Sequence, residues 1–308
     1  MTTAWVFPGQ GSQVVGMGRE LYDQSSAARK VFEEADAALG FSISSLCFDG
    51  PEEQLTATEN AQPALLTTSY AYLEAARQQA HPLIFEQPAF VAGHSLGEYS
   101  ALLAAGAFDL ATAVRLVRRR GELMAAASAG TMAAILGLDE APLEALCKQV
   151  ASEGEGDDWK VVIANYNAPG QLVISGGVPG VQRVSELAKA AGAKRAVPLK
   201  VSAAFHSPLM RDAAAAMAQV LADAPIADLE VPLLANVTAD ERQQAASVRE
   251  ELTQQVASPV RWVASIEYMT QRGVDTFIEV GPGNVLAGLI KRIAPQAQTI
   301  NIRTLVEG

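Results

Sequence analysis

Short apolar runs alternate with longer stretches of helical periodicity along this chain. Four runs have the length and composition of buried strands, at residues 5–7, 90–92, 231–234 and 276–280. Three of them lead into glycine-containing turns that are followed by helical periodicity. This alternation predicts an α/β fold with a largely parallel sheet.

The middle of the chain follows a different order. Two helical and four strand-like segments alternate there, the helices at 141–151 and 181–191 and the strands at 132–138, 161–164, 171–175 and 195–201. The order βαββαβ is the split βαβ or ferredoxin-like pattern. We therefore expect a small subdomain at residues 129–198, inserted into a larger α/β subdomain made of residues 1–128 and 199–308.

The composition indicates a large core and limits the partners. The 308 residues are 49% hydrophobic, and 23 Lys and Arg against 34 Asp and Glu give a formal net charge of −11. Attraction to nucleic acid or to an anionic membrane needs a basic excess, so neither is an expected partner. No apolar run reaches the roughly 18–20 residues of a membrane span, and the N-terminus lacks signal-peptide features.

The two cysteines, Cys47 and Cys147, lie far apart and beside apolar residues. This spacing argues against a disulfide framework and against a cysteine-rich metal site. We expect a cytoplasmic protein without a bound metal.

A candidate nucleophile lies in the pentapeptide Gly93-His94-Ser95-Leu96-Gly97. The pentapeptide follows a strand-like run and precedes a helical one, which is the context of a nucleophile elbow. The sharp turn would strain the serine backbone, and the following helix would direct its N-terminal N–H groups at a developing oxyanion. The alternative is an ordinary glycine-rich turn in which Ser95 caps the helix.

A nucleophilic serine needs a base, and the chain has only three histidines. His94 is the neighbour of Ser95, and His81 precedes Pro82 in a polar loop. His206 is left as the candidate general base; its alternative role is that of a buried structural histidine. About 100 residues follow His206, which argues against an ordinary α/β-hydrolase, whose histidine lies near the C-terminus.

A glycine-rich segment follows the first strand. Dinucleotide binding through G-x-G-x-x-G would need Gly9, Gly11 and a glycine at position 14, which is Val14. The segment is better explained as a tight loop whose Gln10 N–H faces the pentapeptide. The N–H groups of Gln10 and Leu96 would then form an oxyanion hole.

Arg120 lies on the apolar face of a helix that begins after Asp109. At about 100° per residue, it falls between Val117 and Met124 on that face. A guanidinium there costs several kcal/mol unless an anion satisfies it. The anion is either an internal carboxylate or a carboxylate of the substrate held by both guanidinium arms. Gly121 allows a close approach to this helix.

The sequence resembles the malonyl-CoA:acyl carrier protein transacylases and, more broadly, the acyltransferases of fatty-acid and polyketide synthesis. The similarity covers the whole chain and is carried by motifs in the family order. The motifs are Pro8-Gly-Gln-Gly-Ser-Gln, Gly93-His-Ser-Leu-Gly-Glu, Arg120-Gly121, Asn165-Tyr-Asn-Ala-Pro-Gly-Gln, Phe205-His206, Ser258-Pro-Val-Arg-Trp and Val280-Gly-Pro-Gly.

The resemblance implies an α/β-hydrolase-like core with a ferredoxin-like insert. It also implies a serine acyltransferase in which Ser95 is paired with His206 and Arg120 binds the malonyl carboxylate. Gln10 and Leu96 would supply the oxyanion N–H groups.

The resemblance further implies three orienting or substrate-binding residues. The main-chain carbonyl of Gln255 would orient the histidine, and Asn165 and Phe205 would lie at the substrate. Phe205 would narrow the pocket and so favour malonyl over methylmalonyl. Ala203 departs from many malonyl-selective polyketide domains, which have a histidine there.

The implied reaction transfers malonyl from malonyl-CoA to the phosphopantetheine thiol of acyl carrier protein, with no bound cofactor and in a monomer. The pathway is fatty-acid synthesis, or alternatively a polyketide line served by a discrete acyltransferase. A serine hydrolase and a non-enzymatic binding module are the competing function classes. Because carrier proteins are acidic, docking needs local cations, for which the candidates are Arg118, Arg119, Lys194, Arg195, Lys200, Lys291 and Arg292.

Overall fold

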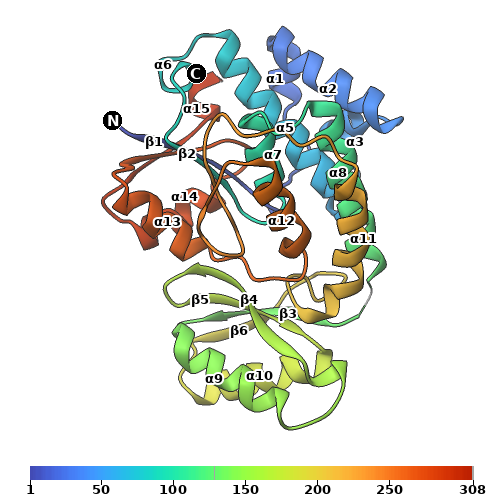
Figure 1. The fold of residues 1–308 in the computed structure, drawn as a ribbon, viewed down its shortest axis with the longest axis vertical. Helices are drawn as coiled ribbons and strands as arrows, with labels where there is room; N and C mark the ends of the chain where they lie inside the picture. Colours follow the sequence, from blue (N-terminus) through green and yellow to red (C-terminus); the bar gives the residue numbers. More distant parts are fainter. Residues whose placement is uncertain (128, 307–308) are drawn as a thin grey trace.

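A six-stranded sheet forms the centre of the larger part of the computed structural model, which describes residues 1–127 and 129–306 (Figure 1). Its order is β10-β9-β1-β2-β7-β8, and every neighbouring pair is parallel except β7 with β8. The strands are β1 (Thr3–Phe7), β2 (Phe90–Gly93), β7 (Leu233–Leu234), β8 (Glu241–Arg242), β9 (Thr276–Glu279) and β10 (Gln298–Asn301). The predicted α/β class with a largely parallel sheet is confirmed.

The predicted strand at 231–234 is shorter than expected. Only Leu233 and Leu234 belong to β7. Pro232 has no N–H to donate, and it contributes only its carbonyl, which accepts from Val91 N at 3.0 Å.

Side chains of β1 alternate between two hydrophobic cores, as the period of a strand requires. Trp5 and Phe7 enter the larger core, whereas Ala4 and Val6 enter a second core beneath α13 (Trp262–Gln271) and α14 (Val285–Ile293). The larger core is covered by the remaining helices of this part. They are α1 (Arg19–Gln24), α2 (Ser26–Leu39), α3 (Ile43–Asp49), α4 (Glu52–Thr56), α5 (Thr58–Gln78), α6 (Pro82–Phe85), α7 (Gly97–Ala104), α8 (Leu110–Ala126), α11 (Arg211–Ala222), α12 (Ala245–Gln255) and α15 (Arg303–Val306).

A second, four-stranded sheet lies at the lower end of the molecule in Figure 1. It is antiparallel, in the order β4-β5-β3-β6, and has its own hydrophobic core against two helices. Its elements are β3 (Thr131–Leu136), α9 (Glu140–Ala151), β4 (Val161–Ala168), β5 (Gln171–Gly176), α10 (Val178–Ala190) and β6 (Arg195–Pro198). Short 3-10 turns lie at η1 (Asp157–Trp159) and η2 (Pro208–Met210).

This second sheet lies within the segment predicted as a subdomain and has the expected element order. The predicted strand at 195–201 ends early, at Pro198, because Val201 N turns back to Leu199 O at 3.1 Å. The predicted strand at 161–164 instead continues to Ala168 through two irregularities in its pairing with β5. The subdomain boundaries at 128/129 and 198/199 stay a prediction.

Main-chain contacts join the two parts near the middle of β4. Tyr166 N donates to Val260 O at 2.9 Å, and Val260 N donates to Ala164 O at 2.8 Å. Asn165, between them, pairs with Val260 as an isolated parallel bridge. The junction therefore places Asn165 of the small sheet beside the larger part.

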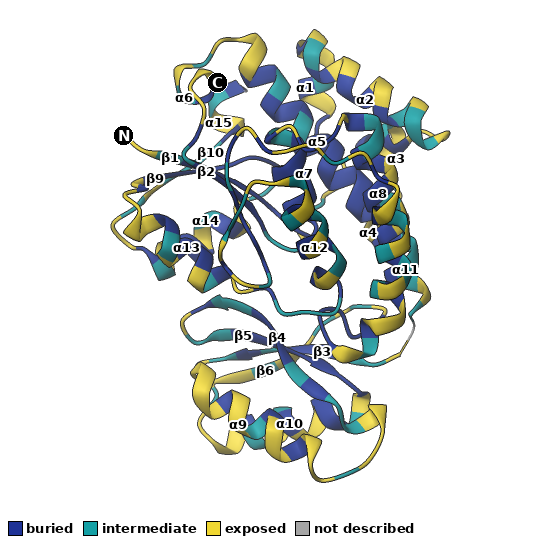
Figure 2. Ribbon diagram, viewed as in Figure 1, coloured by how far each residue is buried: buried dark blue, intermediate teal, exposed yellow. Residues whose placement is uncertain are grey.

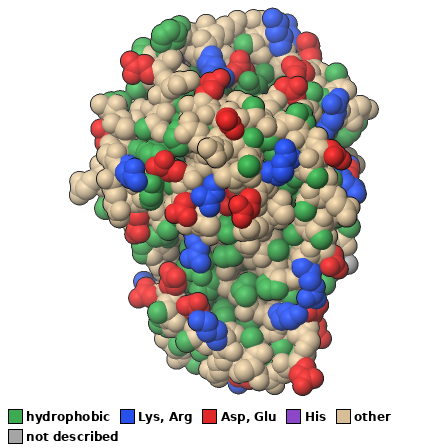
Figure 3. Space-filling view, viewed as in Figure 1, with side chains coloured by type: hydrophobic (Ala, Val, Ile, Leu, Met, Phe, Trp, Pro, Cys, Tyr) green, Lys and Arg blue, Asp and Glu red, His purple; other side chains and the backbone are tan. Residues whose placement is uncertain are grey.

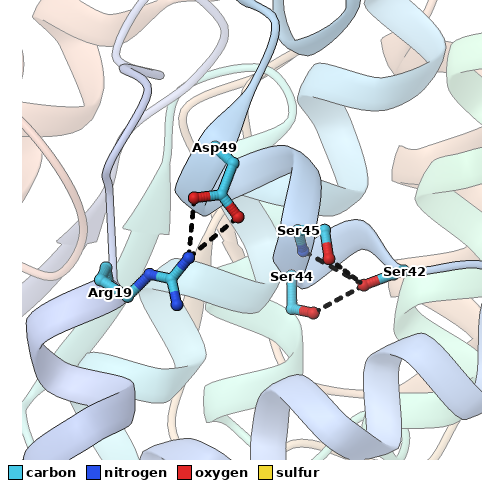
Figure 4. A network of polar contacts seen from close by, with 5 residues as sticks. All are labelled: Arg19, Ser42, Ser44, Ser45 and Asp49. Carbon is cyan, nitrogen blue, oxygen red and sulfur yellow. Dashed lines mark hydrogen bonds and ion pairs between the residues drawn. The ribbon is translucent and has the colours of Figure 1, made fainter.

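Burial follows this architecture, since the strands of the large sheet are mostly buried and the outer helix faces are exposed (Figure 2). At the periphery, Arg19 binds both carboxylate oxygens of Asp49 at 2.8 and 2.9 Å, which links α1 to the end of α3 (Figure 4). Ser42 caps α3 by accepting from Ser45 N at 3.2 Å. Within the described residues, no helix has the length and apolar character needed to span a bilayer.

Candidate active site

Ser95 lies in the turn between the parallel strand β2 and helix α7. Its φ is +51°, a left-handed value that costs free energy in a residue with a Cβ. The turn is tight because a Cβ on Gly93 would lie 1.9 Å from the Gly97 carbonyl carbon, and one on Gly97 would lie 2.0 Å from Phe7 O. Strand, strained serine and helix follow each other as the elbow pattern predicts.

His206 meets Ser95 from the segment that follows β6. The distance between His206 Nε2 and Ser95 Oγ is 2.7 Å. Nδ1 lies 3.0 Å from Gln255 O and 3.0 Å from Ser258 O. Two carbonyl acceptors require the hydrogen on Nδ1, so Nε2 is free to accept the serine proton. The carbonyl of Gln255 lies where the resemblance implies it, and that of Ser258 was not anticipated.

Burial dominates the electrostatics of His206, which is 4% exposed. Desolvation, followed by the charges of Arg120 and His94, lowers its pKa to about 3. The imidazole is therefore neutral near pH 7, which is the form that a general base requires.

Arg120 is 1% exposed and ends beside the same serine. Its Nη1 donates to Gln62 Oε1 at 2.8 Å, and its Nη2 donates to Gln255 Oε1 at 2.8 Å and to Ser95 Oγ at 3.2 Å. Burial lowers its pKa. Among the described residues, Nε has no hydrogen-bond partner and no carboxylate forms an ion pair with the guanidinium.

The direct internal ion pair considered for Arg120 is therefore wrong, because two amide oxygens and the Ser95 hydroxyl accept from the guanidinium. Gly121 allows a close approach to this helix, as expected, and the group that approaches is the start of α5. A Cβ at Gly121 would lie 2.7 Å from Glu59 Cα and 2.8 Å from Thr58 O, so the glycine admits the start of α5. This close packing brings Gln62 of α5 to Arg120.

Ser95, Arg120 and His206 line one cavity of about 690 Å³. The other candidate residues lie around it, namely Gln10, Leu96, Asn165 and Phe205. The Gln10 side chain is held by a bond to Thr58 Oγ1 at 3.3 Å, and Leu96 lies at the N-terminus of α7. Gln255 does not line the cavity itself, but it contacts Arg120 and His206, which do.

The sequence matches the family model described as acyl transferase domain over residues 4–307. The chain belongs to this acyl transferase family. The malonyl CoA-acyl carrier protein transacylase of Bacillus subtilis (strain 168) is 50% identical over 302 residues, which are 97% of this chain and 92% of that protein. The protein of the same name from Escherichia coli (strain K12) is 45% identical over 293 residues, 94% of this chain and 92% of that one.

Solved structures of the acyl transferase family have the same fold. The acyl-carrier-protein-S-malonyltransferase of Bartonella henselae superposes with a TM-score of 0.94 at 45% identity, covering 100% of this chain and 98% of that one. A malonyl-transacylase in complex with its type II polyketide synthase (PKS) acyl carrier protein gives a TM-score of 0.93 at 40% identity, covering 100% and 99%. The family resemblance seen in the sequence is confirmed.

In this acyl transferase, sequence reasoning missed Asn236, which lies just beyond β7. Its Oδ1 accepts from Ser95 N at 2.8 Å, and its Nδ2 donates to Gly93 O at 2.7 Å. The available signal was its position, because the carboxyl ends of neighbouring parallel strands meet at one edge of a sheet. Gln62 gave no such signal, since it lies inside a long buried helix.

The candidate docking cations differ in their surroundings. Arg118 and Arg119 both form ion pairs with Glu122, and Arg292 donates to Pro169 O and Gln171 Oε1. Lys194, Arg195 and Lys200 are exposed and form no ion pair with any residue that the structure describes. On the face in Figure 3, basic side chains are scattered among acidic ones.

Lys200 and the pair Lys194–Arg195 lie in different places. Lys200 lines the cavity that contains Ser95. In β6, Arg195 pairs with Leu136 and Pro198 pairs with Ala133. Pro198 is the end of β6 that leads to Lys200 and the cavity, so Arg195 is at the opposite end. Lys194 and Arg195 therefore lie at the outer end of the edge strand β6.

Proposed function

We propose that this chain transfers the malonyl group of malonyl-CoA to the phosphopantetheine thiol of acyl carrier protein, for fatty-acid synthesis. The names of the relatives and the whole-length match to the family support this activity. The observation that carries it is the distance of 3.2 Å between the buried Arg120 Nη2 and Ser95 Oγ. A charged guanidinium this close to Ser95 supports binding of the free malonyl carboxylate there, through two parallel hydrogen bonds.

In the first half-reaction Ser95 Oγ attacks the thioester carbonyl, and its proton passes to His206 Nε2. The new O–C bond produces a tetrahedral oxyanion, which we assign to the N–H groups of Gln10 and Leu96. The oxyanion collapses, the C–S bond breaks, and His206 returns the proton to the CoA thiolate. The product is a malonyl ester of Ser95.

In the second half-reaction the phosphopantetheine thiol attacks this ester while His206 takes the thiol proton. The Ser95 O–C bond breaks, and the proton returns to Ser95 Oγ. In both half-reactions Asn165 and Phe205 line the acyl pocket. The carbonyls of Gln255 and Ser258 hold the His206 imidazole in place. The thioester carries the activated acyl group, so the proposed steps need no resident cofactor or metal.

Intact-mass analysis after mixing with malonyl-CoA tests this proposal. The wild type should gain one malonyl group, and Ser95→Ala should gain none. Acyl carrier protein should then remove the adduct and carry the added mass. Absence of a wild-type adduct, or the same adduct on Ser95→Ala, would contradict the assignment. Rapid release of malonate without carrier protein would favour the hydrolase instead.

A polyketide pathway is the second candidate. The structural match to a malonyl-transacylase bound to a type II PKS acyl carrier protein favours it specifically. Transfer rates to carrier proteins of both pathway types, measured from the same malonyl-enzyme, distinguish the two.

A cytoplasmic location and a monomeric state belong to the same proposal. The free, buried thiols of Cys47 and Cys147 support a reducing compartment, and sedimentation measurements test the monomer.

A further inference from the structure

A buried carboxylate lies directly behind the nucleophile and takes no part in the proposed steps. Glu98 is three residues after Ser95, on the first turn of α7, and is 0% exposed. Its Oε1 accepts from Asn236 N at 2.8 Å, and its Oε2 accepts from Gln255 Nε2. A carboxyl group that is removed from water needs such donors, so the burial of Glu98 depends on the N–H groups of Asn236 and Gln255.

The Gln255 amide joins this carboxylate to the substrate side of the site. Its Nε2 donates both to Glu98 Oε2 and to Ser95 O, the latter at 2.9 Å. Its Oε1 faces the opposite way and accepts from Arg120 Nη2 at 2.8 Å. The amide can satisfy Arg120 only in this orientation, because a flipped amide would direct its NH₂ group at the guanidinium.

Glu98 and the Ser95 carbonyl, which both accept from Gln255 Nε2, together select this orientation. Glu98 Oε2 accepts from the Gln255 NH₂ group, which leaves Gln255 Oε1 to accept from Arg120. Gln255 thus separates the buried Glu98 carboxyl group from the buried Arg120 guanidinium. An anion in direct contact with Arg120 would compete with a substrate carboxylate, whereas a neutral amide oxygen holds the guanidinium and leaves its charge available.

We propose that Glu98 is a positioning residue for recognition of the substrate carboxylate: it fixes the Gln255 amide, which in turn holds Arg120 beside Ser95. This inference rests on the proposed function, since it concerns how the same site distinguishes malonyl from acyl groups without a carboxylate. Glu98 also supports Ser95 through Asn236, whose Oδ1 accepts from Ser95 N. The acylation rate alone therefore does not isolate the link to Arg120.

The decisive measurement is the ratio of Ser95 acylation rates with malonyl-CoA and acetyl-CoA, followed by intact mass. In Glu98→Gln the remaining side-chain oxygen can satisfy only one of the two donors, Asn236 N and Gln255 Nε2. Because the main-chain N–H of Asn236 cannot turn, we expect the new NH₂ group to face Gln255 Nε2, so that the Gln255 amide turns or loses its bond. A hydrogen bond to a charged group contributes about 1.5–3 kcal/mol, so we expect the ratio to fall about tenfold or more. A general loss of structure would slow both substrates alike and leave the ratio unchanged.

Glu279→Gln is the matched control. Glu279 is also buried and also accepts two N–H groups, from Leu286 at 3.0 Å and Ala287 at 2.9 Å, neither of which contacts Ser95. We expect it to keep the wild-type ratio. If Glu98→Gln does not fold, Gln255→Met removes the same amide while keeping the main-chain carbonyl at His206, and it should lower the ratio similarly.

The outcomes separate this inference from the function on which it rests. If the wild type forms a malonyl adduct and the ratio is unchanged in folded Glu98→Gln, or in Gln255→Met where that variant replaces it, the positioning role is wrong. A wild type that forms no malonyl adduct overturns the proposed function, and the role of Glu98 falls with it. A lowered ratio in Glu98→Gln together with a wild-type ratio in Glu279→Gln supports the proposal.

Discussion

Ser95 and His206 are 111 positions apart, yet both have a left-handed backbone, with φ values of +51° and +57°. Neither is a glycine, so each conformation is held by its surroundings at a cost of about 1–3 kcal/mol. The Ser95 N–H is fixed by Asn236, and the His206 imidazole is fixed by the carbonyls of Gln255 and Ser258. Strain at both ends of one 2.7 Å contact indicates a pair oriented for reaction.

The low pKa of His206 predicts an unusual pH profile for acylation. A lowered pKa means that the imidazole binds a proton only at lower pH, about 3, so the base stays neutral from pH 7 down to pH 5. For an ordinary histidine, with a pKa near 6.5, the fraction in the neutral, proton-accepting form would be about 30-fold lower at pH 5. We expect the rate of Ser95 acylation, measured by rapid quench, to stay nearly constant over this interval. A decline centred near pH 6.5 would show that the histidine titrates normally.

Replacing the guanidinium should reverse the acyl preference. Arg120→Ala removes the charged donors beside Ser95, and we expect malonyl-CoA to lose about 100-fold in kcat/KM for acylation. The acetyl group has no carboxylate that could contact Arg120, so the rate of acylation by acetyl-CoA should fall much less. The variant should then prefer acetyl-CoA, as measured by competition between the two thioesters. Equal use of malonyl-CoA by Arg120→Ala and wild type would remove Arg120 from substrate recognition.

Local patterns in the sequence were sufficient to predict most of the elements and to select three candidate site residues that the structure brings together. An apolar run predicted the strand β2 that precedes Ser95, and helical periodicity placed Arg120 on a buried face, where the structure has it. A count of three histidines was enough to select His206. Each of these inferences depends on near neighbours in the chain or on a scarce residue type.

The supporting contacts were not predictable in this way. Asn236, Gln62 and Glu98 are common polar residues whose partners lie far away in sequence, and Glu98 reaches Asn236 across 138 positions. The internal carboxylate considered for Arg120 was a reasonable solution to its burial cost. The chain instead uses two amides from different helices, which no local pattern distinguishes from surface glutamines.

Carrier-protein docking should depend on the exposed cations at the outer end of β6. Reversing Lys194 and Arg195 to Glu should raise the KM for acyl carrier protein about tenfold at low salt, because an acidic partner loses local attraction. Acylation of Ser95 by malonyl-CoA should remain unchanged. Lys30→Glu with Lys148→Glu gives the same change in net charge at exposed positions on α2 and α9. If both double variants weaken transfer equally, the partner responds to net charge and not to this location.

Glu279 should make the stability of the fold depend on pH in a direction opposite to that of most carboxylates. It is 1% exposed, and burial raises its pKa to about 7, although the N–H groups of Ala287 and Leu286 act against that rise. A raised pKa means that the folded state holds the proton more tightly than the unfolded chain, where the value is 4.5. The stabilising contribution of the proton is therefore complete below pH 4.5 and is lost as pH rises through 7.

Glu279→Gln isolates this contribution, because the amide does not titrate and all other groups are shared with the wild type. We expect the free energy of unfolding of the wild type, minus that of Glu279→Gln, to fall by at most about 3 kcal/mol between pH 4.5 and 8. Urea unfolding of both proteins at several pH values measures the difference. A difference that stays constant over this range, or rises, would mean that Glu279 is ionised throughout and that the two N–H groups of α14 outweigh its burial.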